Sequence, residues 1–368
     1  KVGEKFNIQL LTSNDLELIL QLWCYHLLEE GVSSLHFEFN KAFSAMEKVT
    51  GEIEGGYALI GMVAKEGLFA FRDPQGIRPL VIGRKKMGDG YSYCICSETV
   101  AMNFLGHEYW RSVLPGEFIF IDSKGKIQSK IIQSQKKKAS CMFEWVYFSG
   151  AEGVLEERSV YTTRLKLGQR LALKAQEALE KREIDPWVVA PVPDTSRTAS
   201  IALAEKLNLP YREVFIKNRY SHRSFILDSQ EKRQRTVELK LSPVCSEIEG
   251  KNIMLVDDSI VRGTTSRRIV SLLKEYGARE VTLAITCPPI AYPCYYGIDF
   301  PSAEELVAYG RSIEDINEKI GAKKIIYLDE DDLREAIGLD SLCMACLNGK
   351  YPTSIKEGGY FSKLRKRE

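Results

Sequence analysis

The sequence predicts an α/β protein with two domains, in which a strand-rich region precedes a region built around a parallel sheet. Short apolar segments separated by turn residues fill the first third of the chain, a polar segment follows at residues 122–140, and apolar strands then alternate with helices. We place the domain boundary in the polar segment and expect domains over residues 1–135 and 141–368. With 368 residues, each domain can bury a sizeable core.

The first region is expected to begin with a helix and to continue as strands. Asn14 and Glu17 have the spacing of a capping box, and leucines crowd the residues that follow. Strand candidates come next, at residues 57–64, 67–72, 79–83, 91–96 and 118–121. Turn sequences at residues 73–76 and 88–90 separate them. Strands of this kind suit two layered sheets.

The second region repeats a strand, a loop and a helix. Residues 187–190 form a buried strand candidate, and a helix is expected over residues 198–207. Residues 252–256 form a second strand candidate, followed by a loop and an amphipathic helix that Gly277 should end. Residues 281–286 supply a further strand. This alternation predicts a parallel sheet with helices on its faces, and such sheets bind ligands at the carboxyl ends of their strands.

Composition argues against several classes of protein. The net charge of +1 creates no overall field that would recruit nucleic acid or an anionic membrane. No apolar run reaches the roughly 18 residues of a membrane-spanning helix, and the first residues lack the apolar core of a signal peptide. Nine cysteines, an odd number, argue against a disulfide scaffold and favour the reducing cytoplasm. The four histidines are scattered, so a histidine-based metal site is poorly supported.

The strongest chemical signal is the run VDDSIVRGTTS at residues 256–266, where an apolar strand leads into a helix. Adjacent carboxylates at Asp257 and Asp258 suit vicinal ribose hydroxyls and the water shell of Mg²⁺. Gly263 lets the backbone approach an anion, and the helix start favours a phosphate. Three hydroxyl groups follow in a row, on Thr264, Thr265 and Ser266. The alternative interpretation is an N-capped helix with two acids in its entry loop.

This run resembles the loop that binds 5-phosphoribosyl 1-pyrophosphate (PRPP) in type I phosphoribosyltransferases, in the form found in amidophosphoribosyltransferases. The resemblance extends over nearly the whole chain. It implies that PRPP is bound by eight residues of the run, namely Asp257, Asp258, Ser259, Arg262, Gly263, Thr264, Thr265 and Ser266. It also implies that Asp257 and Asp258 act in catalysis.

Two further segments resemble parts of the same site. Residues 191–196, PVPDTS, are similar to the family's pyrophosphate loop, and Thr195 would join the two aspartates around Mg²⁺. Lys217 and Arg219, followed by Arg223, resemble the mobile loop that closes over PRPP, where cations neutralise the developing pyrophosphate charge, with Lys217 as the catalytic one. Taken alone, these segments would be a helix-entry turn and a solvated basic loop.

The cysteines suggest a metal centre. Cys343 and Cys346 form a CxxC pair, which suits zinc, redox chemistry or an iron–sulfur cluster. The resemblance adds Cys141 and Cys294, because one subgroup of the family carries a [4Fe–4S] cluster on four thiolates at such positions. Tetrahedral Zn²⁺ is the competing metal, and free buried thiols are a third interpretation. The other five cysteines are expected in the core, with Cys94 and Cys96 on opposite faces of a strand.

The first region resembles the glutaminase domain of the family, an N-terminal-nucleophile (Ntn) hydrolase of αββα type. The resemblance lies in residues 69–80 and in residues 12–17, where Asp15 would hold the glutamine α-amino group. An acid that stabilises a helix N-terminus is the alternative role for Asp15. In the family a cysteine at the mature N-terminus attacks glutamine, but residue 1 here is lysine. We therefore expect a truncated chain whose glutaminase half is inactive as given.

The resemblance implies that ammonia, taken from glutamine in the full-length enzyme, replaces the pyrophosphate of PRPP to give 5-phosphoribosylamine, the first step of de novo purine biosynthesis. It also implies nucleotide feedback inhibitors and a homo-oligomer, either a dimer or a tetramer. Two alternatives are another type I phosphoribosyltransferase and a regulatory protein that binds PRPP. The first would need a base-recognition hood in place of the glutaminase-like strands. The segment FSGAEG at residues 148–153 departs from the family's pattern, which contains Arg-Pro-Asp.

Overall fold

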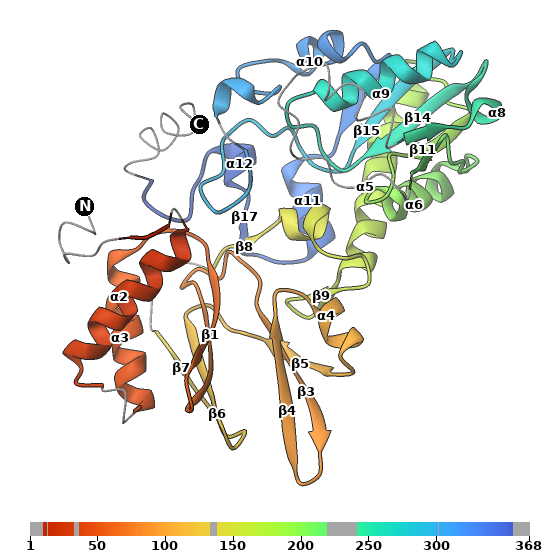
Figure 1. The fold of residues 1–368 in the computed structure, drawn as a ribbon. Coiled ribbons are helices and arrows are strands. Elements are labelled where there is room, and N and C mark those ends of the chain that lie inside the picture. The colour runs from red at the N-terminus through yellow and green to blue at the C-terminus, as the bar shows by residue number, and fades with distance from the viewer. Residues whose placement is uncertain are drawn as a thin grey trace.

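The protein was analysed as a computed structural model that describes residues 10–12, 14–32, 37–132, 138–218, 241–300 and 302–355. We refer to residues 10–132 as the N-terminal region and to residues 138–355 as the C-terminal region. Figure 1 shows the two regions meeting where the short strands β8 and β17 lie side by side. Among the described residues, no helix is long and apolar enough to cross a membrane.

Two helices, α2 (Asp15–Glu29) and α3 (Phe39–Glu52), form the outer layer of the N-terminal region. The Asn14 side chain caps α2 by accepting from the backbone N–H of Leu16 at 2.9 Å. The expected capping box does not form with Glu17, whose carboxylate accepts instead from the backbone N–H groups of Leu11 and Thr12. Helix α3 was not predicted, although one face carries the buried residues Ala42, Ala45, Met46 and Val49.

The strands of the N-terminal region form two antiparallel sheets, in agreement with the expected layering. The larger sheet has the order β1-β2-β6-β7, with β1 (Ala58–Val63), β2 (Gly67–Arg72), β6 (Glu117–Asp122) and β7 (Ile127–Ile131). The smaller has the order β4-β3-β5, with β3 (Val81–Met87), β4 (Gly90–Cys96) and β5 (Glu108–Ser112), and the helix α4 (Thr99–Phe104) packs against it. Aromatic side chains, among them Trp23, Phe69 and Phe118, fill the core between the larger sheet and the helices. A second core lies between the sheets, around Ala70, Ile82 and Ile119.

Three further expectations were wrong. The polar linker expected over residues 122–140 contains β7, an edge strand that is held by backbone pairing with β6 while most of its side chains stay exposed. The amino-acid composition of β7 therefore resembles that of a loop. Cys94 and Cys96 lie on the same face of β4, because side chains two residues apart in a strand point the same way. Burial, and then the nearby Cys94 thiol, raise the pKa of Cys96. Cys24 and Cys245 are exposed and are not core residues.

The C-terminal region contains the predicted parallel sheet. Its order is β11-β14-β15-β16, with β11 (Val188–Pro191), β14 (Asn252–Asp257), β15 (Glu280–Ile285) and β16 (Lys324–Tyr327). Helices α5 (Val160–Glu180), α6 (Arg197–Leu207) and α11 (Glu330–Ile337) share one apolar core, and α9 (Thr264–Glu275) and α10 (Ile313–Ile320) share the other. The sheet is therefore covered on both faces, as expected from the alternating pattern.

Shorter elements complete the C-terminal region. These are β8 (Ser140–Cys141), the π-helix η1 (Glu144–Phe148), β9 (Val154–Leu155), β10 (Arg158–Ser159), β12 (Phe215–Lys217), β13 (Leu241–Pro243), α8 (Cys245–Ile248), η2 (Ala303–Glu305), β17 (Leu342–Cys343) and α12 (Ala345–Asn348). Strands β8 and β17 pair in parallel, so that Cys141 lies opposite Cys343. The end of the described chain is thereby fastened to the start of the C-terminal region.

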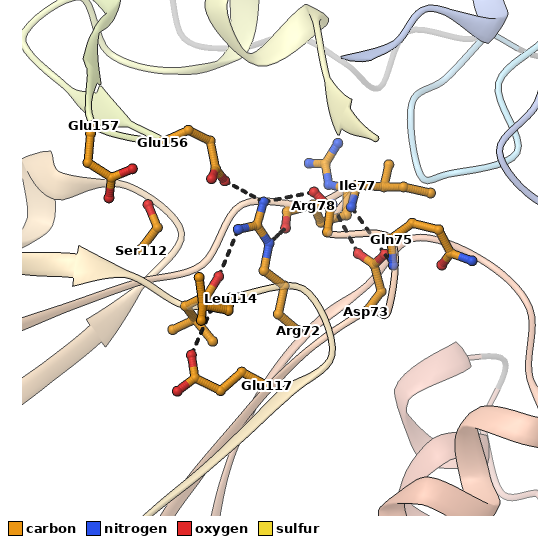
Figure 2. A network of polar contacts seen from close by, with 12 residues as sticks. Arg72, Asp73, Gln75, Ile77, Arg78, Ser112, Leu114, Glu117, Glu156 and Glu157 are labelled. Atoms are coloured by element: carbon orange, nitrogen blue, oxygen red, sulfur yellow. Dashed lines mark hydrogen bonds and ion pairs between the residues drawn. The ribbon is translucent and has the colours of Figure 1, made fainter. Parts of the chain in front are cut away.

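Arg72 lies at the centre of a polar network where the two regions meet (Figure 2). The side chain is 1% exposed and donates to the carbonyl groups of Arg78, Val113 and Gly76 at 2.7–2.8 Å. Its guanidinium also forms an ion pair of 2.6 Å with Glu156 of the C-terminal region. Next to it, the Asp73 carboxylate accepts from the backbone N–H groups of residues 75, 77 and 78, which builds the turn expected at residues 73–76.

Candidate active site

The two predicted ligand loops meet at one edge of the parallel sheet. Strands β11 and β14 are neighbours, with Pro191 opposite Val256, so the loops that follow them leave the sheet together. The Thr195 side chain in the first loop lies close enough to the Asp258 carboxylate in the second to lower the pKa of that acid. The structure therefore brings together Thr195, Asp257 and Asp258, the three residues expected around Mg²⁺.

The aspartate pair is held by the start of its own loop. The backbone N–H of Asp258 donates to Asp257 Oδ1 at 2.9 Å, and the Ser259 hydroxyl donates to Asp258 Oδ1 at 2.8 Å. Burial, together with the charge of Asp258, raises the pKa of Asp257 well above its ordinary value. Burial also raises the pKa of Asp258 to about 6, although the Ser259 hydroxyl and the Arg164 charge oppose the shift. Two acids that disfavour each other's charge at a ligand edge suit a divalent cation with oxygen ligands.

Gly263 allows the turn into α9. Its φ of +75° lies in the left-handed region, and a Cβ atom there would approach Val307 Cγ2 to 3.0 Å. Thr264 and Thr265 begin the helix in exposed positions, and Ser266 is buried in its first turn. Arg262 forms an ion pair of 2.9 Å with Glu305. The N-terminus of α9 thus presents backbone N–H groups beside the aspartate pair, as a phosphate site requires.

The loop at residues 191–196 is linked to the predicted cations by its acid. Asp194 accepts from Lys217 Nζ at 2.5 Å and from a guanidinium N–H of Arg197 at 2.8 Å. Lys217 is the last residue of β12, so the predicted catalytic cation does reach the ligand edge. The peptide bond between Pro193 and Asp194 is cis. Arg219 and Arg223 lie outside the described residues.

Sequence reasoning missed two residues next to the aspartate pair. Arg164 is 4% exposed in α5, and its charge interacts with Asp258. An arginine in an amphipathic helix is normally a surface residue, so the sequence carried no signal of its burial. Cys287 is also buried, and its backbone N–H donates to the Asp258 carbonyl at 3.0 Å. Burial and the nearby Asp258 charge raise the pKa of its thiol.

The four predicted metal-binding cysteines come together in the core of the C-terminal region. Their names are Cys141, Cys294, Cys343 and Cys346, and all are buried as free thiols. Burial raises the pKa of Cys346, and the charges of Cys287, Cys141, Cys294 and Cys343 add to the shift in that order. Burial also raises the pKa of Cys141, and the charges of Glu144, Cys343 and Cys294 add to that shift. Within the described ranges, no three histidine, cysteine or acidic residues are placed to hold a metal ion. Four gathered thiols nevertheless have the donor chemistry of a soft metal centre.

The predicted glutamine-binding residue, Asp15, is the first residue of α2 and is exposed. Its place in the first turn of the helix agrees with the alternative role of an acid near a helix N-terminus. A glutamine-binding role for Asp15 stays a prediction.

A parallel sheet with paired acidic and hydroxyl-rich loops at one edge defines a phosphoribosyltransferase-type domain, and the phosphoribosyl transferase domain family matches residues 161–297. The chain belongs to the amidophosphoribosyltransferase family. It is 39% identical to the amidophosphoribosyltransferase of Pseudomonas aeruginosa, over 96% of this chain and 71% of that protein. It is also 39% identical to that of Saccharomyces cerevisiae, over 97% of this chain and 70% of the relative.

A solved structure agrees with this assignment. Glutamine phosphoribosylpyrophosphate amidotransferase from B. subtilis, complexed with ADP and GMP, superposes with a TM-score of 0.82 at 38% sequence identity. The similarity covers 97% of this chain and 75% of that chain. It therefore includes the N-terminal region as well as the part that the domain family matches.

Proposed function

We propose that this protein transfers ammonia to PRPP, with 5-phosphoribosylamine and pyrophosphate as products, in the first step of de novo purine biosynthesis. The observation that carries the proposal is the meeting of Asp257, Asp258 and Thr195 at the edge where β11 and β14 end. Lys217 reaches the same edge through Asp194. In the family these residue types hold a metal-chelated sugar diphosphate.

Each group in the site has a part in the proposed reaction. Mg²⁺ would be held by Asp257, Asp258 and Thr195 and would supply positive charge beside the departing pyrophosphate. Lys217 is a second source of positive charge, once its ammonium group leaves the Asp194 carboxylate and binds the ligand. The start of α9 binds a phosphate through its N–H groups. No covalent intermediate with the protein is needed, so most of the catalysis comes from positioning and charge neutralisation.

The direct test supplies PRPP, Mg²⁺ and ammonia at alkaline pH and measures phosphoribosylamine and pyrophosphate. Ammonia is the chosen donor because it bypasses the glutaminase reaction. We expect product from the unsubstituted protein and a loss of at least about 100-fold in Asp257→Asn and Asp258→Asn proteins, since each removes a charge at the ligand edge. Asp331→Asn, which changes an exposed acid of α11, is the matched control.

The outcomes separate the proposal from its alternatives. Retained activity in both aspartate variants would overturn the assigned site. PRPP binding without product would favour a PRPP-binding regulatory protein. Product with a nucleobase but none with ammonia would favour another type I phosphoribosyltransferase.

We also propose a [4Fe–4S] cluster on Cys141, Cys294, Cys343 and Cys346, with a structural role. The gathering of four buried free thiols supports it, as does the pairing of Cys141 with Cys343 across β8 and β17. Protein purified without oxygen should be brown and contain iron and sulfide, and Cys343→Ser should bleach it while Cys24→Ser should not. Colourless protein with stoichiometric zinc would establish Zn²⁺ as the metal instead. Protein that contains neither metal would show that the four cysteines are free thiols.

The remaining parts of the proposal concern the whole protein. The N-terminal region would be the Ntn hydrolase domain, with the domain boundary between residues 135 and 141 and with Asp15 holding the α-amino group of glutamine. Because the B. subtilis relative was solved with ADP and GMP, nucleotide feedback is also proposed for this chain. We further propose a homo-oligomer, either a dimer or a tetramer, located in the cytoplasm.

A further inference from the structure

Asp194 lies in the loop that follows β11, at the ligand edge of the parallel sheet. This loop begins beside the loop that carries the aspartate pair, because the backbone N–H of Val192 donates to the Val256 carbonyl at 2.8 Å. The Ser196 hydroxyl donates back to the Val192 carbonyl at 2.6 Å and closes the loop. Figure 1 shows β11 and β14, the two strands that lead into these loops, next to each other. Backbone hydrogen bonds therefore anchor the Asp194 loop at the ligand edge.

The Asp194 carboxylate binds two cations, one with each of its oxygens. Lys217 Nζ donates to Oδ2 at 2.5 Å, and a guanidinium nitrogen of Arg197 lies 2.8 Å from Oδ1. The cations come from different elements, since Lys217 ends β12 and Arg197 begins α6. Two oxygens of a phosphate group can bind a pair of cations in the same way. The carboxylate thus takes the part of a bound anion in the ligand-free site.

Arg197 is held in place by a second contact. Its Nε donates to Glu213 Oε1 at 3.1 Å, and the Tyr211 hydroxyl donates to the same oxygen at 2.7 Å. Tyr211 also pairs with Val189 of β11, which fixes this end of the network to the sheet. The Lys217 side chain is the more exposed of the two cations, at 53% against 39% for Arg197. Lys217 can therefore leave the shared carboxylate while Arg197 remains bound to it.

Exchange of Lys217 between Asp194 and a ligand has a consequence for affinity. An incoming diphosphate must replace the carboxylate at the Lys217 ammonium, and after the reaction the carboxylate competes with pyrophosphate for the same ammonium. Each ligand binds more weakly for this reason, because its binding breaks an ion pair of the ligand-free protein. The contact with Arg197 keeps the carboxylate compensated while Lys217 is away, so the exchange leaves no unpaired acid.

We propose that Asp194 is a positioning residue that acts through Lys217. It holds the ammonium at the ligand edge while the site is empty, and it competes with pyrophosphate for that ammonium, which lowers the affinity for this product and promotes its release. The inference rests on the proposed function, because pyrophosphate is taken as the product. An asparagine at this position keeps the shape of the side chain but loses the charge that competes for Lys217.

The test is calorimetry with Mg²⁺, which measures the dissociation constant for pyrophosphate. It compares the unsubstituted protein with Asp194→Asn, Asp194→Glu, Lys217→Met and the double variant Asp194→Asn/Lys217→Met. The glutamate variant keeps a competing carboxylate, and Lys217→Met removes the ammonium for which carboxylate and product compete. Asp331→Asn, which changes an exposed acid of α11, controls for the loss of one negative charge. Circular dichroism confirms that each variant is folded.

We expect Asp194→Asn to bind pyrophosphate at least about fivefold more tightly than the unsubstituted protein, because an exposed ion pair no longer competes. Asp194→Glu and Asp331→Asn should stay within about twofold of the unsubstituted protein. In the Lys217→Met background, Asp194→Asn should change the dissociation constant by less than about twofold, since the two residues act as a pair. If the Lys217→Met proteins bind too weakly to measure, the contrast of Asp194→Asn with Asp194→Glu and Asp331→Asn decides the matter.

Unchanged or weaker binding of pyrophosphate by the folded Asp194→Asn protein would overturn this role. So would an equal gain in affinity with and without Lys217, because general charge repulsion would then explain the gain. Failure of the unsubstituted protein to bind either pyrophosphate or PRPP would instead count against the proposed function.

Discussion

Asp258 combines burial with a charge that its proposed reaction requires. Without a cation, burial raises its pKa from the ordinary value of 3.8 to about 6. The folded protein then binds more protons than the unfolded chain between about pH 4 and pH 6, so the free energy of unfolding falls as pH rises through that window. The ionised carboxylate is thus tolerated at neutral pH at the expense of stability, as at many functional sites.

We therefore predict that Asp258→Asn stabilises the metal-free protein at pH 7, by up to about 3 kcal/mol, because it removes the ionised buried group. Urea unfolding at about pH 4.5 and pH 7, without Mg²⁺, would measure this, and the fall in stability between the two values should be smaller in the variant. The exposed acid Asp331, changed to asparagine, should leave that fall unaltered. A fall of equal size in the Asp258 variant would contradict the prediction.

Sequence reasoning located the residues whose chemistry is local and missed those defined by long-range packing. The run at residues 256–266 carries its acids, glycine and hydroxyls in one continuous stretch, so Asp257, Asp258 and Gly263 could be singled out. Arg164 lies more than ninety residues before Asp258, and only the folded chain brings their charges together. The same reason explains why Cys287 was assigned merely to the core.

At the scale of elements, helices α5 and α6 pack closely against each other at Gly168. A Cβ atom at Gly168 would come within 2.1 Å of the Ala199 carbonyl oxygen. Backbone atoms cannot swing away as a side-chain tip can, so the helices would have to separate. Both helices belong to the core that also includes Met254 and Val256 of β14, just before the aspartate pair.

We predict that Gly168→Ala destabilises the protein by about 1–3 kcal/mol, because overpacking outweighs the roughly 1 kcal/mol by which alanine favours a helix. Thermal or urea unfolding measures the change. Gly51→Ala in α3 is the control, since nothing lies within 4 Å of the added atom, and it should be neutral or slightly stabilising. Equal effects of the two substitutions would show that helix propensity, and not packing, decides the result.

Elements with a clear apolar pattern were predicted well, and those without one were not. The strand at residues 67–72 has the observed limits, and the helix expected over residues 198–207 begins one residue earlier. Strand β3 continues to Met87, beyond the predicted end at residue 83. The prediction stopped early because Lys85 and Lys86 are exposed and charged, although they still pair with β4. Backbone pairing of this kind leaves little trace in residue type.

At the scale of the molecule, Arg72 joins the two regions. Its four polar contacts include three carbonyl groups of the N-terminal region and the carboxylate of Glu156 in the C-terminal region (Figure 2). Removal of such a side chain leaves buried carbonyl groups and a carboxylate without their donor.

We predict that Arg72→Met lowers the free energy of unfolding by about 3 kcal/mol or more and separates the unfolding of the two regions into two calorimetric transitions. Arg84→Met is the control, because Arg84 lies over the rings of Tyr91 and Trp110 on the smaller sheet, a contact worth about 0.5–1 kcal/mol. A single transition with unchanged midpoint in Arg72→Met would mean that the junction does not depend on this network.

The parallel pairing of β8 with β17 has a consequence for the order in which the segments of the chain can be connected. Residues 140–141 and 342–343 are more than two hundred positions apart, yet they are hydrogen-bonded neighbours. Segments near the two ends of the phosphoribosyltransferase part therefore lie side by side. That part is consequently suited to circular permutation, with new termini opened in a surface turn such as the one at Arg182 and with the ligand edge left whole.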